Sequence, residues 1–190
     1  MFSERSDRRS SSVHGLGPER ERVAIAARLG LDVERVASAP SVAAIELALF
    51  HVLGDPGDEV LVAASADAIV REVAEVSGLD AVPLETLDAA ALFEAAGERT
   101  RALVIGAADV DAELVAMLGE LDLPLLAPAA VLALRRLFAG EAAPLALVVG
   151  EADGSAWLAV LGPADRAEPL LAHLERFAHV FFARAGGGRP

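Results

Sequence analysis

Acidic side chains that follow a predicted strand are the first candidates for chemistry. Asp109 and Asp111 come shortly after the apolar run that ends at Ile105. They stand at the carboxyl end of a predicted strand, where open α/β sheets bind ligands. Two carboxylates at this place could hold a divalent metal ion. Asp111 also precedes the helical pattern AELVAML, and Asp is a preferred helix N-cap, so we favour the structural interpretation and predict no metal site.

A second acidic pair and three histidines also have simpler structural explanations. Glu151 and Asp153 could act as a general acid and base. However, Asp153 precedes a glycine between two predicted strands, which is typical of a hairpin turn. His51, His173 and His179 lie on predicted helices, and none has a partner at the i, i+4 spacing of a metal-binding pair. We interpret these histidines as packed or solvated side chains.

Arginines and the single tryptophan complete the set of side chains with distinctive chemistry. Arg99 and Arg101 come just before or at the start of a predicted strand, and Arg135 and Arg136 lie on a predicted helix. We expect solvated faces or ion pairs for all four rather than anion sites. Trp157, in the run SAWLAVLG, is expected to pack in the core or at an interface. The sequence contains no Gly-rich phosphate loop, nucleophile elbow or dinucleotide fingerprint.

The residue types that the chain lacks exclude whole classes of chemistry. There is no Lys, Asn, Gln, Tyr or Cys, so Schiff-base, thiol and zinc–thiolate sites are excluded. The 29 acidic residues outnumber the 16 basic ones and give a net charge of −13, which argues against nucleic acid and anionic membrane partners. No apolar run approaches the ~20 residues of a membrane span, and the N-terminus has no apolar signal region. We therefore expect a soluble cytoplasmic protein.

Apolar runs and helical patterns alternate along most of the chain. This alternation, with runs such as ALVIG and LALVVG that are apolar on both faces, predicts a three-layer α/β/α domain with a mostly parallel, roughly seven-stranded sheet. We predict strands at about 35–38, 59–63, 81–84, 101–105, 123–127, 145–149 and 157–161, with helices at about 18–29, 41–53, 67–77, 88–96, from 111, 129–138 and 165–182. Residues 1–14 are expected to form a mobile arm, 15–184 a single domain and 185–190 a flexible tail.

Three segments occur in a specific order: LGPERERVAIAARLGLDVERV, then IELALFHVLGDPGDEVLV, then, after a helix, GLDAVPLETLDAAALFEAAGERTRALVIG. Their order and spacing resemble the large domain of fold-type I pyridoxal-phosphate enzymes of the class I/II aminotransferase kind. The resemblance covers roughly residues 15–165. It implies a dimer that forms across the large domain, and it implies that the chain is truncated, because the family's C-terminal small domain has no counterpart.

The resemblance places a cofactor-binding site, but the matching residues differ from the family pattern. The phosphate-binding turn corresponds to Pro40-Ser41-Val42, where proline removes an amide donor. The segment that carries a ring-stacking aromatic corresponds to Ala63–Ala68, which has no aromatic residue but contains Asp67. The Asn-Pro segment corresponds to 106–111, with Asp109. The resemblance therefore leaves Ser41, Asp67 and Asp109 as remnant cofactor-binding residues.

The catalytic positions are changed as well. Pro128 and Val131 match the family's pyridine-binding Asp and the Tyr three residues later. The segment that supplies the Schiff-base lysine corresponds to 150–154, and no lysine occurs anywhere in the chain. Transamination needs both an imine to lysine and an acid at the pyridine nitrogen. We expect no catalytic residues and no covalently bound pyridoxal phosphate.

Three functions stay open at the level of sequence. The first is a degenerate, non-catalytic aminotransferase-like protein that acts through self-association or a protein partner. The second is a binding module for pyridoxal phosphate or another anion in the remnant pocket, with Ser41 as a contact. The third is a metal-assisted acid/base enzyme that uses Asp67, Asp109 and Asp153.

Overall fold

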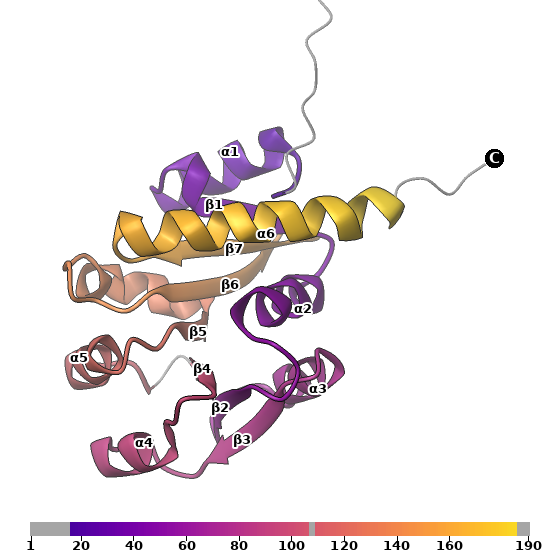
Figure 1. Cartoon of the computed structure of the whole chain (residues 1–190). Helices are drawn as coiled ribbons and strands as arrows, with labels where there is room; N and C mark the ends of the chain where they lie inside the picture. The colour runs from indigo at the N-terminus through magenta and orange to yellow at the C-terminus, as the bar shows by residue number, and fades with distance from the viewer. Residues whose placement is uncertain (1–15, 107–108, 186–190) are drawn as a thin grey trace, which may run out of the picture.

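The computed structural model describes residues 16–106 and 109–185, so the predicted arm and nearly all of the predicted tail lie outside the described residues (Figure 1). Its strands are β1 (Val36–Ala39), β2 (Glu59–Ala63), β3 (Asp80–Leu84), β4 (Thr100–Val104), β5 (Leu125–Pro128), β6 (Ala146–Ala152) and β7 (Ser155–Leu161). Its helices are α1 (Glu19–Leu29), η1 (Val33–Arg35), α2 (Val42–Leu53), α3 (Ala68–Val76), α4 (Ala89–Ala95), α5 (Ala112–Glu120), η3 (Ala129–Phe138) and α6 (Ala164–Ala185).

All seven strands belong to one sheet with the order β1-β7-β6-β5-β4-β2-β3. The five strands from β6 to β3 in this order run parallel, and β7 is antiparallel to both β6 and β1. The mostly parallel seven-stranded sheet predicted from the sequence is therefore confirmed. Within the described residues, no helix is both long and apolar enough to cross a membrane.

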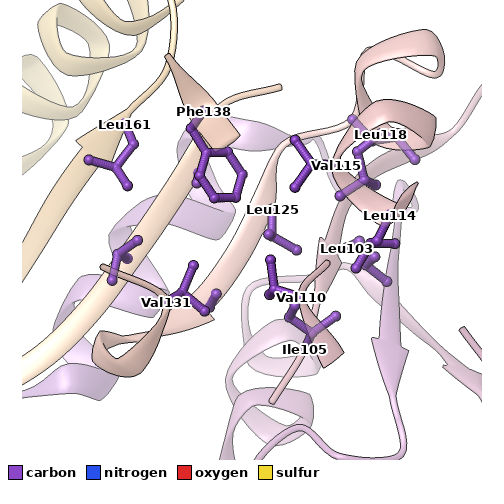
Figure 2. Close-up of a cluster of buried hydrophobic side chains, with 14 of the residues drawn as sticks. Leu103, Ile105, Val110, Leu114, Val115, Leu118, Leu125, Val131, Phe138 and Leu161 are labelled. Carbon is purple, nitrogen blue, oxygen red and sulfur yellow. The ribbon is translucent and has the colours of Figure 1, made fainter. Parts of the chain in front are cut away.

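Helices cover both faces of the sheet, because parallel strands need crossover connections that pack on its faces. One apolar cluster joins the sheet to α1, α4, α5 and η3. Figure 2 shows part of this cluster, with Leu114 and Leu118 of α5 and Phe138 of η3 beside Leu125 of β5. A second cluster joins the opposite face to α2, α3 and α6. In Figure 1, α2 and α3 accordingly lie on one side of the strands and α4 and α5 on the other.

Short polar side chains begin most of the crossover helices. Ser41, Asp67, Asp88 and Asp111 each accept a hydrogen bond from a backbone N–H in the first turn of α2, α3, α4 and α5. These bonds satisfy amide groups that have no partner inside the helix. The prediction that Asp111 is an N-cap is confirmed, with a distance of 2.9 Å from its carboxylate to the amide of Leu114.

The last two strands form a longer hairpin than the sequence predicts. They pair from Ala146 and Leu161 up to Ala152 and Ser155, and only Asp153 and Gly154 remain in the turn. Both turn residues have positive φ, +53° and +82°, as a type I′ hairpin turn requires. The segment from 129 to 138 is helical as predicted, but it consists of 3-10 turns rather than α-helix.

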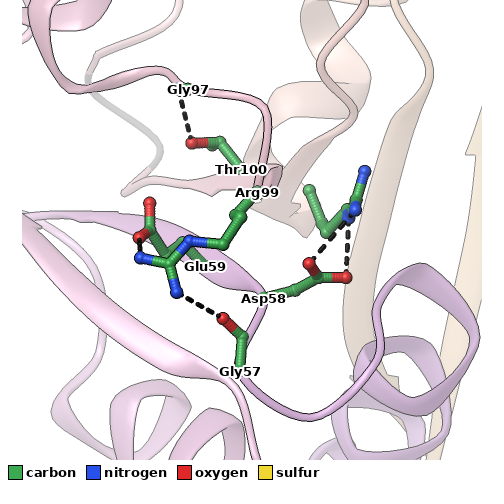
Figure 3. Close-up of polar contacts among 7 residues, drawn as sticks. Gly57, Asp58, Glu59, Gly97, Arg99 and Thr100 are labelled. Atoms are coloured by element: carbon green, nitrogen blue, oxygen red, sulfur yellow. Dashed lines mark hydrogen bonds and ion pairs between the residues drawn. The ribbon is translucent and has the colours of Figure 1, made fainter.

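Ion pairs connect β2 and β4 at the amino ends of these strands (Figure 3). Arg101 donates two hydrogen bonds to the Asp58 carboxylate, at 2.7 and 3.1 Å, and its guanidinium holds the pKa of Asp58 below its usual range. Arg99 pairs with Glu59 at 2.5 Å and also donates to the carbonyl of Gly57. The ion-pair prediction for these two arginines is confirmed.

Tight packing at Gly150 gives a test of the hairpin. A Cβ atom at this position would lie 2.4 Å from the ring of Trp157 and 2.9 Å from the Cβ of Ala129. We expect Gly150→Ala to lower the free energy of unfolding by about 1–3 kcal/mol, because a buried ring must move. Urea denaturation measures this change. Gly140→Ala is the matched control, since nothing lies within 4 Å of its added carbon. Equal stability of the two variants would contradict the packing.

Candidate functional site

A cleft of about 870 Å³ opens at the carboxyl ends of the parallel strands. It lies where β2, β4, β5 and β6 end and where α2 and α3 begin. Its described lining consists of Ser41, Val42, Ala43, Glu46, Ser65, Asp67, Ile69, Val70, Val104, Ile105, Gly106, Leu126, Ala127, Pro128, Ala129, Val149, Gly150 and Glu151.

The strand order explains why a cleft forms at this edge. From β2 the chain crosses to β3 at one end of the sheet, whereas β4, β5 and β6 follow one another in the opposite direction. The connections after β2 and β4 therefore diverge, and ligand sites in open α/β sheets lie at such a switch point. Ser65 and Asp67 follow β2, and Gly106 follows β4, so these residues flank the switch point.

Two of the three remnant residues predicted from the sequence line this cleft. The Ser41 hydroxyl accepts from the amide of Ala44 at 3.2 Å, and the Asp67 carboxylate accepts from the amide of Ile69 at 3.0 Å. Both side chains therefore occupy amide donors at the starts of α2 and α3.

The third remnant residue, Asp109, lies next to the lining rather than in it. The hydroxyl of Ser65 donates a hydrogen bond to Asp109, and the same hydroxyl oxygen accepts from the amide of Gly106 at 3.0 Å. Ser65 thus connects the ends of β2 and β4.

Sequence reasoning missed Glu46, the most deeply buried acidic side chain of the cleft. Its side chain lies on α2, and the residue is only 5% exposed. Within the described residues, no hydrogen bond or ion pair reaches its carboxylate. Burial raises the pKa of Glu46 from 4.5 to about 7, and the negative charge of Asp67 adds to this rise. The available signal was an acidic residue inside the apolar helical run VAAIELALF.

The charged side chains of the cleft all have the same sign. Glu46, Asp67 and Glu151 are acidic, and no Arg or His is present among the described residues of the lining. The other lining side chains are mainly aliphatic. The cleft is therefore an apolar cavity with a negative potential.

The other candidate side chains lie in structural roles. Asp153 is in the exposed hairpin turn, 3.7 Å from Arg28. Trp157 is 3% exposed and packs in the core as predicted. His51 contacts the ring of Phe177 on α6, with centroids 5.1 Å apart. No group of three or more potential metal ligands occurs within 16–106 and 109–185.

Comparison with solved structures places this architecture among known folds. An aminotransferase from Escherichia coli superimposes with a TM-score of 0.68 at 19% identity and covers 88% of this chain. Alanine aminotransferase from Pyrococcus furiosus (17% identity) and tyrosine aminotransferase from Leishmania infantum (16%) both give 0.69 and cover 88%. The chain has the fold of the aminotransferase large domain. It covers 51%, 52% and 57% of these three aminotransferases, about half their length. No family model matches the sequence, and no curated protein matches it.

The residues of this aminotransferase-like cleft do not fit pyridoxal phosphate. The acidic lining repels a phosphate dianion, and the hydroxyl of Ser41 already takes an amide at the start of α2. Pro128, at the position matched to the pyridine-binding acid, has no side chain that could pair with a ring nitrogen. Where the resemblance places the lysine segment, β6 and β7 pair directly through the two-residue turn at Asp153.

The raised pKa of Glu46 predicts a specific pH dependence of stability. Between pH 4.5 and about 7 the folded chain holds a proton on Glu46 that the unfolded chain has lost, so the free energy of unfolding falls as the pH rises through this window. The fall is at most about 3 kcal/mol. We expect Glu46→Gln to remove this component and to be more stable than the wild type above about pH 8.

Urea unfolding at several pH values measures this difference. Glu75→Gln on α3 is the matched control, because Glu75 is exposed and outside the lining. Parallel pH profiles for Glu46→Gln and the wild type would contradict the assignment.

Proposed function

We propose that this protein does not transaminate and that it binds a small molecule in the cleft. The observation that carries the proposal is a cleft of about 870 Å³ at the switch point, a size typical of ligand sites, whose lining lacks the groups that pyridoxal-phosphate chemistry needs. A cavity with three acidic side chains and an aliphatic wall can bind a small molecule through both charge and apolar contacts. A non-catalytic binding module is therefore the function that the geometry supports best.

The residues that the chain lacks support the proposed loss of catalysis. Fold-type I chemistry requires a lysine amine as nucleophile, and the chain contains none. It also requires an acid that keeps the pyridine nitrogen protonated, and Pro128 cannot supply one. Among the described residues of the lining there is no His or Arg with which the acidic side chains could form a mixed acid/base pair.

Titration with pyridoxal phosphate tests the loss of the cofactor site. We expect neither saturable heat nor an absorbance band of a protein-bound imine, because lysine is absent and the cleft repels the phosphate. The Escherichia coli aminotransferase serves as the positive control. An imine band that survives acetylation of the N-terminal amine, or saturable binding of the cofactor, would contradict this part of the proposal.

A fragment screen followed by amide resonances tests the proposal that the cleft binds a small molecule. We expect fragments to shift the amide resonances of Ala43, Gly106 and Gly150 in a saturable way. Ala43→Trp places a large ring in the cleft and should abolish these shifts. Ala90→Trp on α4 is the control, because Ala90 is exposed and does not line the cleft. Shifts that Ala43→Trp leaves unchanged would place binding elsewhere.

A second proposed function is association with another copy of the chain or with a full-length aminotransferase. The supporting observation is an apolar stripe on α3, where Ile69 and Val76 are seven residues apart and 55% and 79% exposed. Light scattering should then show a dimer that Val76→Glu converts to a monomer. Val23→Glu on α1, which is 49% exposed, should leave the dimer intact. A monomeric wild-type protein would rule out self-association.

A further inference from the structure

We propose that the ligand of the cleft is an organic cation, an amine, amidine or guanidine on an apolar body, and that Glu46 is its counter-ion. This inference rests on the proposed binding function and specifies its ligand class. It also reverses the charge preference of a pyridoxal-phosphate site.

The first support is the state of Glu46 in the folded chain. The residue is only 5% exposed and lines the cleft, and no hydrogen bond or ion pair joins its carboxylate to another described residue. Burial of a charged group without a partner is costly, so proteins pair or solvate nearly all such groups. A cationic N–H group in the cleft would supply the missing partner through a charge-assisted hydrogen bond.

The second support is the sign of the surrounding charge. Besides Glu46 on α2, Asp67 lines the cleft at the start of α3 and Glu151 lines it from β6, so three elements each contribute an acidic group. Low-dielectric aliphatic walls strengthen their field. A cation gains from all three carboxylates, whereas an anion is repelled by each of them.

Two helix N-termini at the cleft oppose the preference for a cation, because their free amides and dipoles favour anions. Here, however, a side-chain oxygen of the chain already accepts from one first-turn amide of each helix. Ser41 accepts from Ala44 in α2, and the Asp67 carboxylate accepts from Ile69 in α3. Asp67 also adds a full negative charge where α3 carries a partial positive one, so its carboxylate offsets the anion preference.

The lining favours an organic cation over a metal ion. No cluster of three metal ligands occurs within the described ranges, so the carboxylates are too dispersed to coordinate one ion. The remaining wall includes the aliphatic side chains of Val42, Val70, Val104, Leu126 and Val149. These side chains gain by burying hydrocarbon, which a bare metal ion does not offer. The cleft therefore fits a molecule with one charged end and an apolar body.

A charge series of one shape tests the inference directly. Benzamidine, benzamide and benzoate share a ring and a planar head group, but the head groups are cationic, neutral and anionic. Each is titrated into the full chain near pH 8, with binding followed by calorimetry and by the amide resonances of Ala43, Gly106 and Gly150. We expect benzamidine to bind at least about tenfold more tightly than benzamide, and benzoate not to bind.

Two variants assign the preference to Glu46. Glu46→Gln should weaken benzamidine at least about tenfold and leave benzamide unchanged, and Glu46→Ala provides a second substitution if the first alters the fold. Glu75→Gln removes the same charge from an exposed site and should not change either affinity by more than about twofold, which controls for the net charge of −13.

The outcomes separate this inference from the function on which it rests. Preferred binding of benzamide or benzoate in the cleft would overturn the cationic ligand and leave the binding function standing. Equal affinity of benzamidine for the wild type and for Glu46→Gln would overturn the role of Glu46. Absence of saturable cleft shifts with all three probes and with the fragment library would overturn both proposals.

Discussion

Burial of the parallel strands on both faces is the constraint on which the rest of the structure depends. The strands from β6 to β3 run parallel, so most connections between them must cross a face of the sheet as helices. As a consequence, one apolar cluster lies between the sheet and each of the two helical layers. Because every crossover begins at the carboxyl end of a strand, the helix starts gather at one edge. The divergence after β2 and β4 opens the cleft there.

The two edges of the sheet carry opposite electrostatic arrangements. At the amino edge, Arg99 and Arg101 neutralise Glu59 and Asp58 in close pairs across β2 and β4. At the carboxyl edge, Glu46 and Asp67 lie close enough for one to raise the pKa of the other, and no described cation of the lining separates them. The carboxylates at the amino edge are already paired, whereas under the proposed binding function those at the carboxyl edge would gain interaction free energy from a cationic ligand.

The sequence predicts the fold well because the fold is encoded in local patterns. Apolar runs covered on both faces, Asp and Ser caps, and the glycine after α1 each act within a few residues. Local patterns do not predict that η3 is a 3-10 helix or that the β6–β7 hairpin extends to Ala152 and Ser155. These features depend on tertiary contacts that form only when the chain folds, such as the close approach of Gly150 and Trp157. Ser41 and Asp67 were located by the resemblance, whereas Glu46 was hidden inside an apolar helix.

The proposed loss of catalysis does not require the cleft to lose its shape. A Schiff base depends on one lysine, and here a two-residue turn at Asp153 replaces the segment that the resemblance matches to it. The cavity depends on strand order, helix starts and aliphatic walls, which single substitutions do not remove. In the proposed binding site, the acidic side chains that line the cavity give it a preference for a cation, opposite to the preference of a phosphate site. Glu46, buried on α2, and Asp67, at the start of α3, are the residues on which this proposed preference depends most.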